Sequence, residues 1–234
     1  MNGQDLYNAV TTLLQGFSID KTQFYQFLNT ARTNREMMRP WKRLEKLDQS
    51  QTATTTSLPT LVNQNPKTLP EDFMFLKEDG YLTLYDNNNQ WEDYYEVPQD
   101  QAIRFLQENN RFYIDHANGV YYLTGIVNKP YNIFMYYQYD SGDITEDTKW
   151  NLVPTNKQGT FPMILAYDVA SMWRLGVDYD DINARNADSN ARQAELLFNS
   201  MSKWDDNLAR SAVTQLDYSN QGGNFNHRIN INDD

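Results

Sequence analysis

Side chains able to do catalytic chemistry are sparse in this chain. It contains two histidines, His116 and His227, and no cysteine. A cysteine nucleophile, a thiolate metal site and a disulfide are therefore excluded, and two lone histidines suggest neither a catalytic triad nor a zinc cluster. The only glycine pair, Gly222-Gly223, opens no helix and so predicts no phosphate-binding loop. We expect a protein that is not an enzyme and that has no cofactor or metal.

Carboxylates are plentiful, and two groups of them allow more than one interpretation. Asp140-Ser141-Gly142-Asp143, together with Glu146 and Asp147, could imitate a calcium loop, although the ligand spacing and the closing Glu of an EF-hand are missing. A solvated acidic loop is the preferred interpretation there. The second group is Glu92, Asp93 and Glu96, which lie among aromatic residues and could suggest a glycosidase, since that reaction needs two carboxylates around a sugar.

The aromatic residues of that second group also have two interpretations. Trp91, Tyr94 and Tyr95 could stack on sugar rings if their strand is exposed. Alternatively, they fill a small β core and a subunit interface, where such residues are enriched. We prefer the second interpretation, and a carbohydrate-binding module or glycan hydrolase remains the alternative.

The net charge of −11 is unevenly distributed along the chain. Residues 71–147 contain 15 acids and four bases, which accounts for the whole excess. Because phosphate neutralisation needs clustered bases, this balance disfavours sequence-specific nucleic-acid binding. A basic patch nevertheless precedes the acidic segment, and it consists of Arg32, Arg35, Arg39, Lys42, Arg43 and Lys46. It is either a solvated face beside a helix C-terminus or a surface for DNA phosphates or an acidic partner, such as the acidic segment of a neighbouring copy.

Hydrophobic spacing predicts helices at the start of the chain. Leu6, Val10 and Leu14 recur at helical intervals, and Gly16 marks the end of that helix. Asp20 should cap a second helix, which Pro40 should stop. Residues 48–68 are rich in Thr, Gln, Asn and Pro, so we expect a long loop or arm there.

The spacing becomes period two between residues 69 and 139, which predicts β-strands. Asn118-Gly119 is a strong hairpin signal between two such strands. Residues 131–139 carry apolar or aromatic side chains on both faces, so this strand should be central in its sheet. A small antiparallel β domain is expected.

Helical spacing returns after Gly159 and continues almost to the end of the chain. If residues 181–216 form one helix, it outgrows a compact domain of this size, and its outer half could pack on another subunit. The stripe expected to do so is Ala187, Ala191, Ala194, Phe198, Met201 and Leu208. The polar segment after residue 219 should order only on a partner, through Phe225, Ile229 and Ile231.

These patterns predict an α+β fold: a helical bundle with a long C-terminal helix, an inserted small antiparallel β domain and an extended C-terminal tail. The expected parts are N-terminal helices (1–47), an arm (48–68), an acidic aromatic β insertion (69–150), C-terminal helices (160–218) and a flexible tail (219–234). No apolar run is long enough to span a membrane, and the N-terminus lacks the regions of a signal peptide, so we expect a cytosolic protein.

The order of these parts resembles the head-to-tail adaptor, or ring, proteins of tailed bacteriophages, including those of crAss-like phages. The resemblance covers roughly residues 4–218. It includes the junction Arg39-Pro40-Trp41-Lys42-Arg43-Leu44, the sequence Leu69-Pro70-Glu71-Asp72-Phe73, which is similar to an LPxDF motif of such adaptors, and Phe161-Pro162 at the start of a helix. No single motif is specific, and the order of the parts carries the resemblance.

The resemblance implies a structural virion protein, made in the host cytoplasm and located at the portal vertex. Its subunits would form a ring, commonly of twelve copies in such adaptors, that extends the DNA channel between the portal and the tail. The implied partners are further copies of the chain, the portal protein, the tail or next ring protein, and genomic DNA that passes without sequence specificity. The tail residues Phe225, Ile229 and Ile231 are expected to contact the portal.

Overall fold

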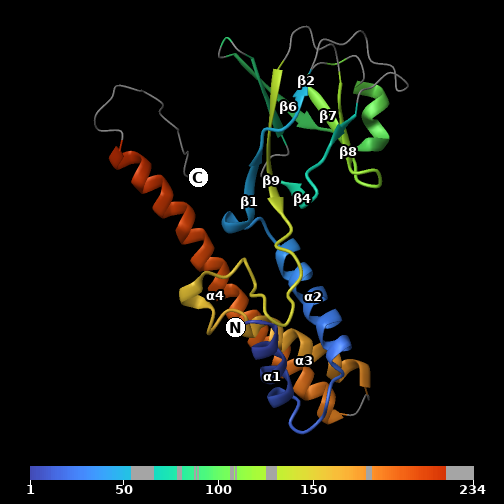
Figure 1. The fold of residues 1–234 in the computed structure, drawn as a ribbon, viewed down its shortest axis with the longest axis vertical. Coiled ribbons are helices and arrows are strands. Elements are labelled where there is room, and N and C mark those ends of the chain that lie inside the picture. Colours follow the sequence, from blue (N-terminus) through green and yellow to red (C-terminus); the bar gives the residue numbers. More distant parts are fainter. Residues whose placement is uncertain are drawn as a thin grey trace.

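In the computed structural model, most of the helical residues occupy one end of an elongated molecule and the strands the other, and the long C-terminal helix extends from the helical end to the level of the sheet (Figure 1). The structure describes residues 1–53, 66–77, 81–86, 88, 90–105, 108, 110–124, 131–177 and 181–219. The helices are α1 (Gly3–Leu13), α2 (Lys21–Met37), α3 (Met163–Val177) and α4 (Asp181–Ser219). Three short 3-10 helices are also present in these ranges: η1 (Lys42–Leu44), η2 (Gln99–Phe105) and η3 (Thr155–Lys157).

The strands in the described ranges form one sheet of nine, organised around β9. They are β1 (Glu45–Asp48), β2 (Thr52–Ala53), β3 (Lys67–Thr68), β4 (Phe73–Leu76), β5 (Tyr81–Tyr85), β6 (Trp91–Glu96), β7 (Arg111–Asp115), β8 (Val120–Leu123) and β9 (Tyr131–Tyr139). The order is β1-β9-β5-β6-β7-β8-β3, and β2 and β4 also pair with β9. The central position predicted for residues 131–139 is therefore confirmed.

The predicted fold class is wrong. The protein is a mixed α/β structure dominated by this nine-stranded sheet and completed by four helices in the described ranges, not a helical bundle with a small β insertion. The sheet is larger than expected because residues 45–53, assigned to the helical part and the arm, supply β1 and β2 to an edge of β9. It is also not purely antiparallel, since β6 and β7 pair in parallel.

The predicted helix boundaries have visible causes. The Asp20 carboxylate accepts hydrogen bonds from the backbone N–H groups of Thr22 and Gln23, at 2.8 and 3.2 Å, and so caps α2 as expected. The helix ends at Met37, shortly before Pro40. The first helix ends before Gly16, whose φ of 95° is readily adopted by glycine.

Period-two spacing correctly predicted the two faces of the sheet. Leu82 and Leu84 of β5 are buried together with Ile133 and Met135 of β9 on the inner face. The intervening residues of both strands point to the opposite face. The predicted hairpin is confirmed as well: residues 116–119 connect β7 to β8, and Gly119 adopts a φ of 64°.

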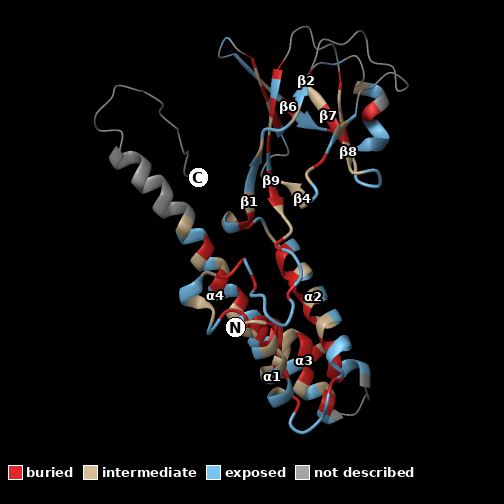
Figure 2. Cartoon of the chain, viewed as in Figure 1, coloured by how far each residue is buried: buried red, intermediate tan, exposed pale blue. Residues whose placement is uncertain are grey.

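A second core fills the helical end, where buried residues gather between α1, α2, α3 and the first half of α4 (Figure 2). Trp41 lies at its upper boundary, just before β1, and is fully buried. Its ring meets Phe198 of α4 edge to face at 5.6 Å, and its Nε1 donates a hydrogen bond to the Arg35 carbonyl at 3.3 Å. Trp41 thereby attaches the start of the sheet to α2 and α4.

We expect Trp41→Ala to lower the free energy of unfolding by about 4 kcal/mol, because it removes a buried aromatic side chain and leaves a cavity. Trp91→Ala is the matched control, since Trp91 is 70% exposed and its loss should change stability by no more than about 0.5 kcal/mol. Urea unfolding followed by circular dichroism measures both. Equal effects of the two substitutions would contradict the anchoring role of Trp41.

Candidate functional site

The basic patch is engaged by acids of the same chain. Arg32 is buried, and its guanidinium lies 2.9 Å from the Glu36 carboxylate, 2.5 Å from Asp140 and 3.4 Å from Asp143. Both aspartates belong to the loop that was considered as a possible calcium site. Their carboxylates are therefore used to hold an arginine, and the loop is tied to α2.

Glu36 is the most enclosed charged residue of this cluster, with no exposed surface. Its carboxylate accepts hydrogen bonds from Arg32, from Trp150 Nε1 at 2.7 Å and from the Ser141 hydroxyl. Burial raises the pKa of Glu36, while the donors Ser141 and Trp150 and the charge of Arg32 act in the opposite direction. Such a carboxylate is acceptable in a core only because its oxygens are satisfied.

Gln138 of β9 extends this network to the sheet. Its side-chain oxygen accepts a hydrogen bond from the Trp41 backbone N–H at 2.6 Å, and its Nε2 donates to the Glu36 carbonyl at 3.0 Å. Because Gln138 is itself buried, these bonds fix where β9 meets the end of α2. We call the contacts of Arg32, Glu36, Gln138 and their partners the ionic junction.

The remaining bases of the patch connect further elements. Arg35 binds Asp168 of α3 at 2.8 Å and Glu195 of α4 at 2.6 Å. Burial acts to lower the pKa of Arg35, but the two carboxylates outweigh it and raise the pKa. The other pairs are Arg39 with Asp205 and Asp206, Lys42 with Glu45, and Lys46 with Asp72.

These contacts leave one base of the patch available to an outside partner. Arg43 is exposed and has no ion pair with the residues that the structure describes. The acidic partner envisaged for a neighbouring copy is found within the same chain, in the segment 71–147 and on α3 and α4. The patch is thus mainly a connector between helices and sheet.

The stripe of α4 predicted to pack on another subunit also lies inside the chain. Ala187, Ala194, Phe198 and Met201 are buried, and α4 makes its most extensive contacts with α3. Ala191 and Leu208 are half-buried. Large apolar side chains on other faces of α4, such as Leu196 with 62% of its surface exposed, are the ones available to a neighbour.

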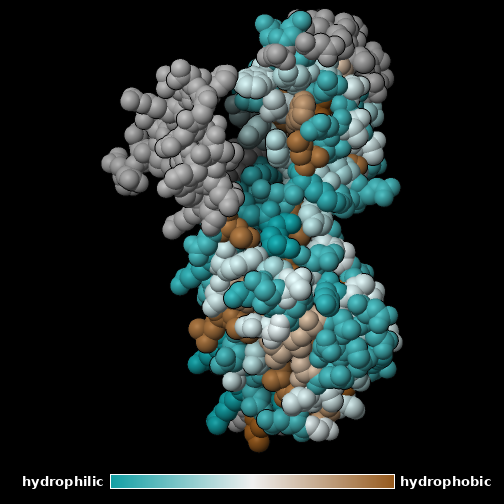
Figure 3. Space-filling view, turned by 60° about the vertical axis from the view of Figure 1, so that its left-hand side comes forward, coloured by the Kyte–Doolittle hydropathy of each residue, from teal (hydrophilic) through white to brown (hydrophobic). Residues whose placement is uncertain are grey.

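Exposed apolar side chains at the helical end form separate small groups within a hydrophilic surface (Figure 3). They include Phe17, Met37, Met38, Leu175, Ile182 and Leu196. The expected portal-contacting residues Phe225, Ile229 and Ile231 lie outside the described residues.

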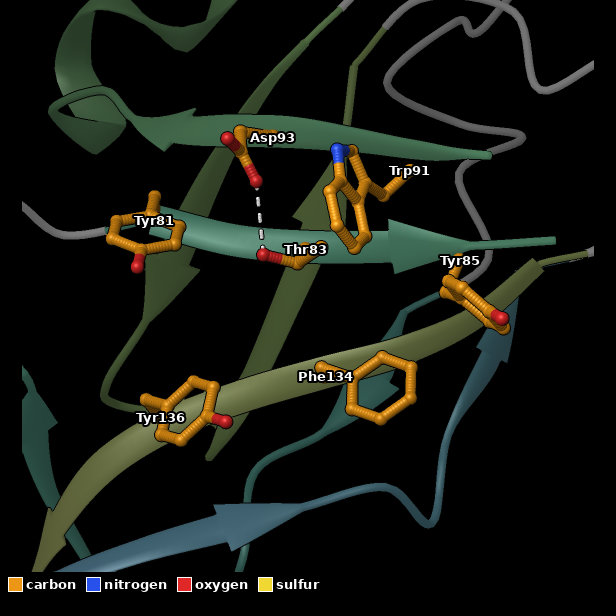
Figure 4. Close-up of a pocket in the computed structure, with 7 residues that line it drawn as sticks. All are labelled: Tyr81, Thr83, Tyr85, Trp91, Asp93, Phe134 and Tyr136. Carbon is orange, nitrogen blue, oxygen red and sulfur yellow. Dashed lines mark hydrogen bonds between the residues drawn. The ribbon is translucent and has the colours of Figure 1, made fainter. Parts of the chain in front are cut away.

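The outer face of the sheet carries an aromatic hollow of about 520 Å³ (Figure 4). Three adjacent strands, β5, β6 and β9, line it. Its lining residues are Tyr81, Thr83, Tyr85, Trp91, Asp93, Phe134 and Tyr136. Trp91 and Asp93 were candidates from the sequence alone. The alternation of Tyr81, Thr83 and Tyr85 with Leu82 and Leu84 is the signal that could have added three further residues of the lining.

Of the three carboxylates that could suggest a glycosidase, Glu92, Asp93 and Glu96, only Asp93 lines the hollow. Its carboxylate accepts a hydrogen bond from the Thr83 hydroxyl at 2.9 Å. Glu92, the residue before Asp93 in β6, accepts a hydrogen bond from the Tyr131 hydroxyl at 2.7 Å and belongs, like Glu96, to the opposite face. Glu92 and Asp93 therefore do not flank a common ligand, and the hollow supports binding rather than a two-carboxylate reaction.

In the described part of the chain, no three His, Asp or Glu side chains gather closely enough to hold a metal ion. Of the helices in the same ranges, none combines the length and the apolar character that a membrane crossing requires. Comparison of the sequence with protein-family models and with curated proteins found no match.

We expect Arg32→Met to lower the free energy of unfolding by about 3 kcal/mol, because it leaves the buried Glu36 carboxylate without its cation. Adding Glu36→Gln should recover part of that loss, since the unpaired charge is then removed as well. Arg43→Met is the control and should be nearly neutral, because Arg43 is exposed. Urea titrations of all three variants test this, and an Arg32→Met protein as stable as Arg43→Met would refute it.

Asp72 makes the attachment of β4 sensitive to pH. Its carboxylate accepts hydrogen bonds from Lys46 and, at 2.8 Å, from the Tyr137 hydroxyl. Burial acts to raise the pKa of Asp72, but these donors outweigh it and lower the pKa below its ordinary value. The unfolded chain therefore takes up the proton first as the pH falls.

The stability that Asp72 contributes should be complete at neutral pH and should disappear as the pH falls through and below the ordinary aspartate value of about 3.9. We expect Asp72→Asn to cost about 1 kcal/mol at pH 7 and progressively less as the pH falls below the ordinary aspartate value. Urea unfolding of both proteins across this range provides the measurement, with Glu71→Gln as a neighbouring control. A cost that is independent of pH would contradict the ionic role.

Proposed function

We propose that this chain is a structural subunit of a bacteriophage neck, a head-to-tail adaptor that assembles with copies of itself into a ring between the portal and the tail. The proposal rests on the resemblance in the order of the parts and on one structural observation, the length of α4. This helix has 39 residues, about 58 Å at ~1.5 Å per residue.

The structure describes the packing of α4 within the chain for its side chains up to Leu208. Its most extensive contacts are with α3, and Glu195 also binds Arg35 of α2. Among the α4 side chains that the structure describes, which end at Leu208, the last buried one is Asp205, and the C-terminal turns of the helix extend away from the sheet (Figure 1). In sequence, Leu208, Ala212 and Leu216 continue the apolar spacing beyond this point. Because helices in water are stabilised mainly by packing of an apolar face, we expect the outer part of α4 to pack against another subunit.

A closed ring supplies such a neighbour for every copy, since each subunit offers the same pair of surfaces to the next one. The elongated molecule, with different elements at its two ends, suits a subunit that contacts one component at each end. The ionic junction supports this role because it holds helices and sheet in a fixed relation. An acidic surface on such a conduit repels DNA and prevents it from sticking.

Mass photometry of the purified full chain, alone and mixed with portal rings from the same phage, tests the proposal. We expect particles of about a dozen copies, alone or on the portal. A variant that ends at Leu208 should lose them, because it lacks the outer part of α4. A variant lacking only residues 220–234 is the control and should still form rings.

A full chain that stays monomeric both alone and with portal rings would overturn the proposed function. Unchanged portal binding by the variant without residues 220–234 would remove the role assigned to Phe225, Ile229 and Ile231. The ring itself would survive that second result.

A further inference from the structure

We propose that the aromatic hollow on β5, β6 and β9 binds a basic side chain, above all an arginine, of a protein partner. The inference stands on the lining of the hollow alone. It does not require the chain to form a ring, although in a neck it would identify the sheet as a docking surface for the adjoining component.

The strand register arranges the hollow as aromatic rows around a polar centre. Tyr85 stands opposite Trp91, and Thr83 stands opposite both Asp93 and Phe134. Figure 4 shows Tyr81 and Tyr136 on one side of the Thr83–Asp93 pair and Trp91 on the other, all projecting from the same face. The rows begin at Tyr81 and end at Tyr85, about 14 Å apart at ~3.4 Å per residue.

The rings are accessible to a ligand. Trp91 is 70% exposed and Tyr136 is 43% exposed, whereas the apolar residues on the inner face of the same strands are buried. Tyr85 and Phe134 meet edge to face at 5.9 Å, which helps to hold the Phe134 ring in place. Ring faces carry partial negative charge, and they attract a guanidinium that stacks on them.

The polar centre reinforces the preference for a cation. Asp93 is the only charged residue of the lining, and the Thr83 hydroxyl holds its carboxylate at 2.9 Å. No base in the described part of the chain pairs with Asp93, unlike the acids at the ionic junction. A guanidinium in the hollow could therefore stack on an aromatic ring and donate hydrogen bonds to this carboxylate.

The surrounding charge distinguishes a basic partner from other ligands. Residues 81–115 contain seven acids and two bases, and no lysine or arginine lines the hollow. Phosphates and acidic peptides are thereby disfavoured. A neutral saccharide could stack on the same rings but would gain nothing from the acidic field. Arginine, tyrosine and tryptophan are also the residues most enriched at the energetic centres of protein interfaces.

Fluorescence anisotropy with the full chain tests this, because the method works for a monomer and for a ring. The probe is a labelled Gly-Ser peptide that carries two arginines, and its partner peptide carries citrulline, which keeps the shape and removes the charge. We expect the citrulline peptide to bind about tenfold more weakly. Trp91→Ala and Asp93→Asn should each weaken binding of the arginine peptide about fivefold or more.

Two controls separate the hollow from the general acidic field. Asp100→Asn removes one exposed acid of the same segment outside the hollow and should change the affinity less than about twofold. Trp91→Phe retains a ring face and should keep most of the binding. Because Trp91 and Asp93 are exposed, circular dichroism should show all variants folded.

Equal losses for Asp93→Asn and Asp100→Asn would overturn the proposal, since the peptide would then sense only net charge. Equal affinity for the arginine and citrulline peptides would overturn it too. Calorimetric titration with cellohexaose and maltohexaose tests the saccharide alternative. If the chain binds one of these sugars but not the arginine peptide, and Trp91→Ala abolishes the sugar binding, the hollow is a saccharide site instead. Mass photometry of Trp91→Ala and Asp93→Asn should show unchanged assembly, so failure here is distinguishable from failure of the ring proposal.

Discussion

The arrangement of the whole molecule depends on how the carboxylate of Glu36 is satisfied in a place without water. A buried charge is tolerated only with a partner and a full set of hydrogen bonds. Those groups come from α2 through Arg32, and from the loop after β9 through Ser141 and Trp150. Meeting this requirement brings α2 and the loop after β9 together, although they are about 100 residues apart in the sequence. The junction contributes more to a unique orientation of helices and sheet than to net stability, because desolvation offsets much of the attraction.

Local signals in the sequence were sufficient for the local structure. The cap at Asp20, the hairpin at Asn118-Gly119 and the two faces of residues 131–139 were all predicted, because each depends on neighbours in the chain. The size of the sheet was not predicted, since β2 is only two residues long and too short to show a period. Its place is set by pairing with β9, about eighty residues further along, and such a pairing leaves no local trace.

The same limit explains why spacing alone does not show which surfaces are covered within the chain. The basic patch looked available because the partner of Arg32, Asp140, is 108 residues away in sequence. The stripe of α4 looked available for the same reason: spacing identifies an apolar face but not whether α3 already covers it. Side-chain alternation along β6 is enough to predict that Glu92 and Asp93 point to opposite faces of the sheet. That Phe134 lies beside Thr83 could not be predicted in this way, because it depends on which strands are neighbours.

Most bases of the basic patch form ion pairs within the chain, and this changes which surface charges are available to a partner. The acids near Arg32 and Lys46 are compensated, whereas residues 81–115, which supply β5, β6 and β7, contain seven acids and two bases, and Asp93 of this segment lines the hollow. Electrostatic attraction can then steer a basic partner towards the sheet, while apolar side chains such as Leu196 can contact a neighbour at the helical end. Because the two kinds of attraction act on different ends of one firmly connected body, a partner bound at one end leaves the other end free for a different contact.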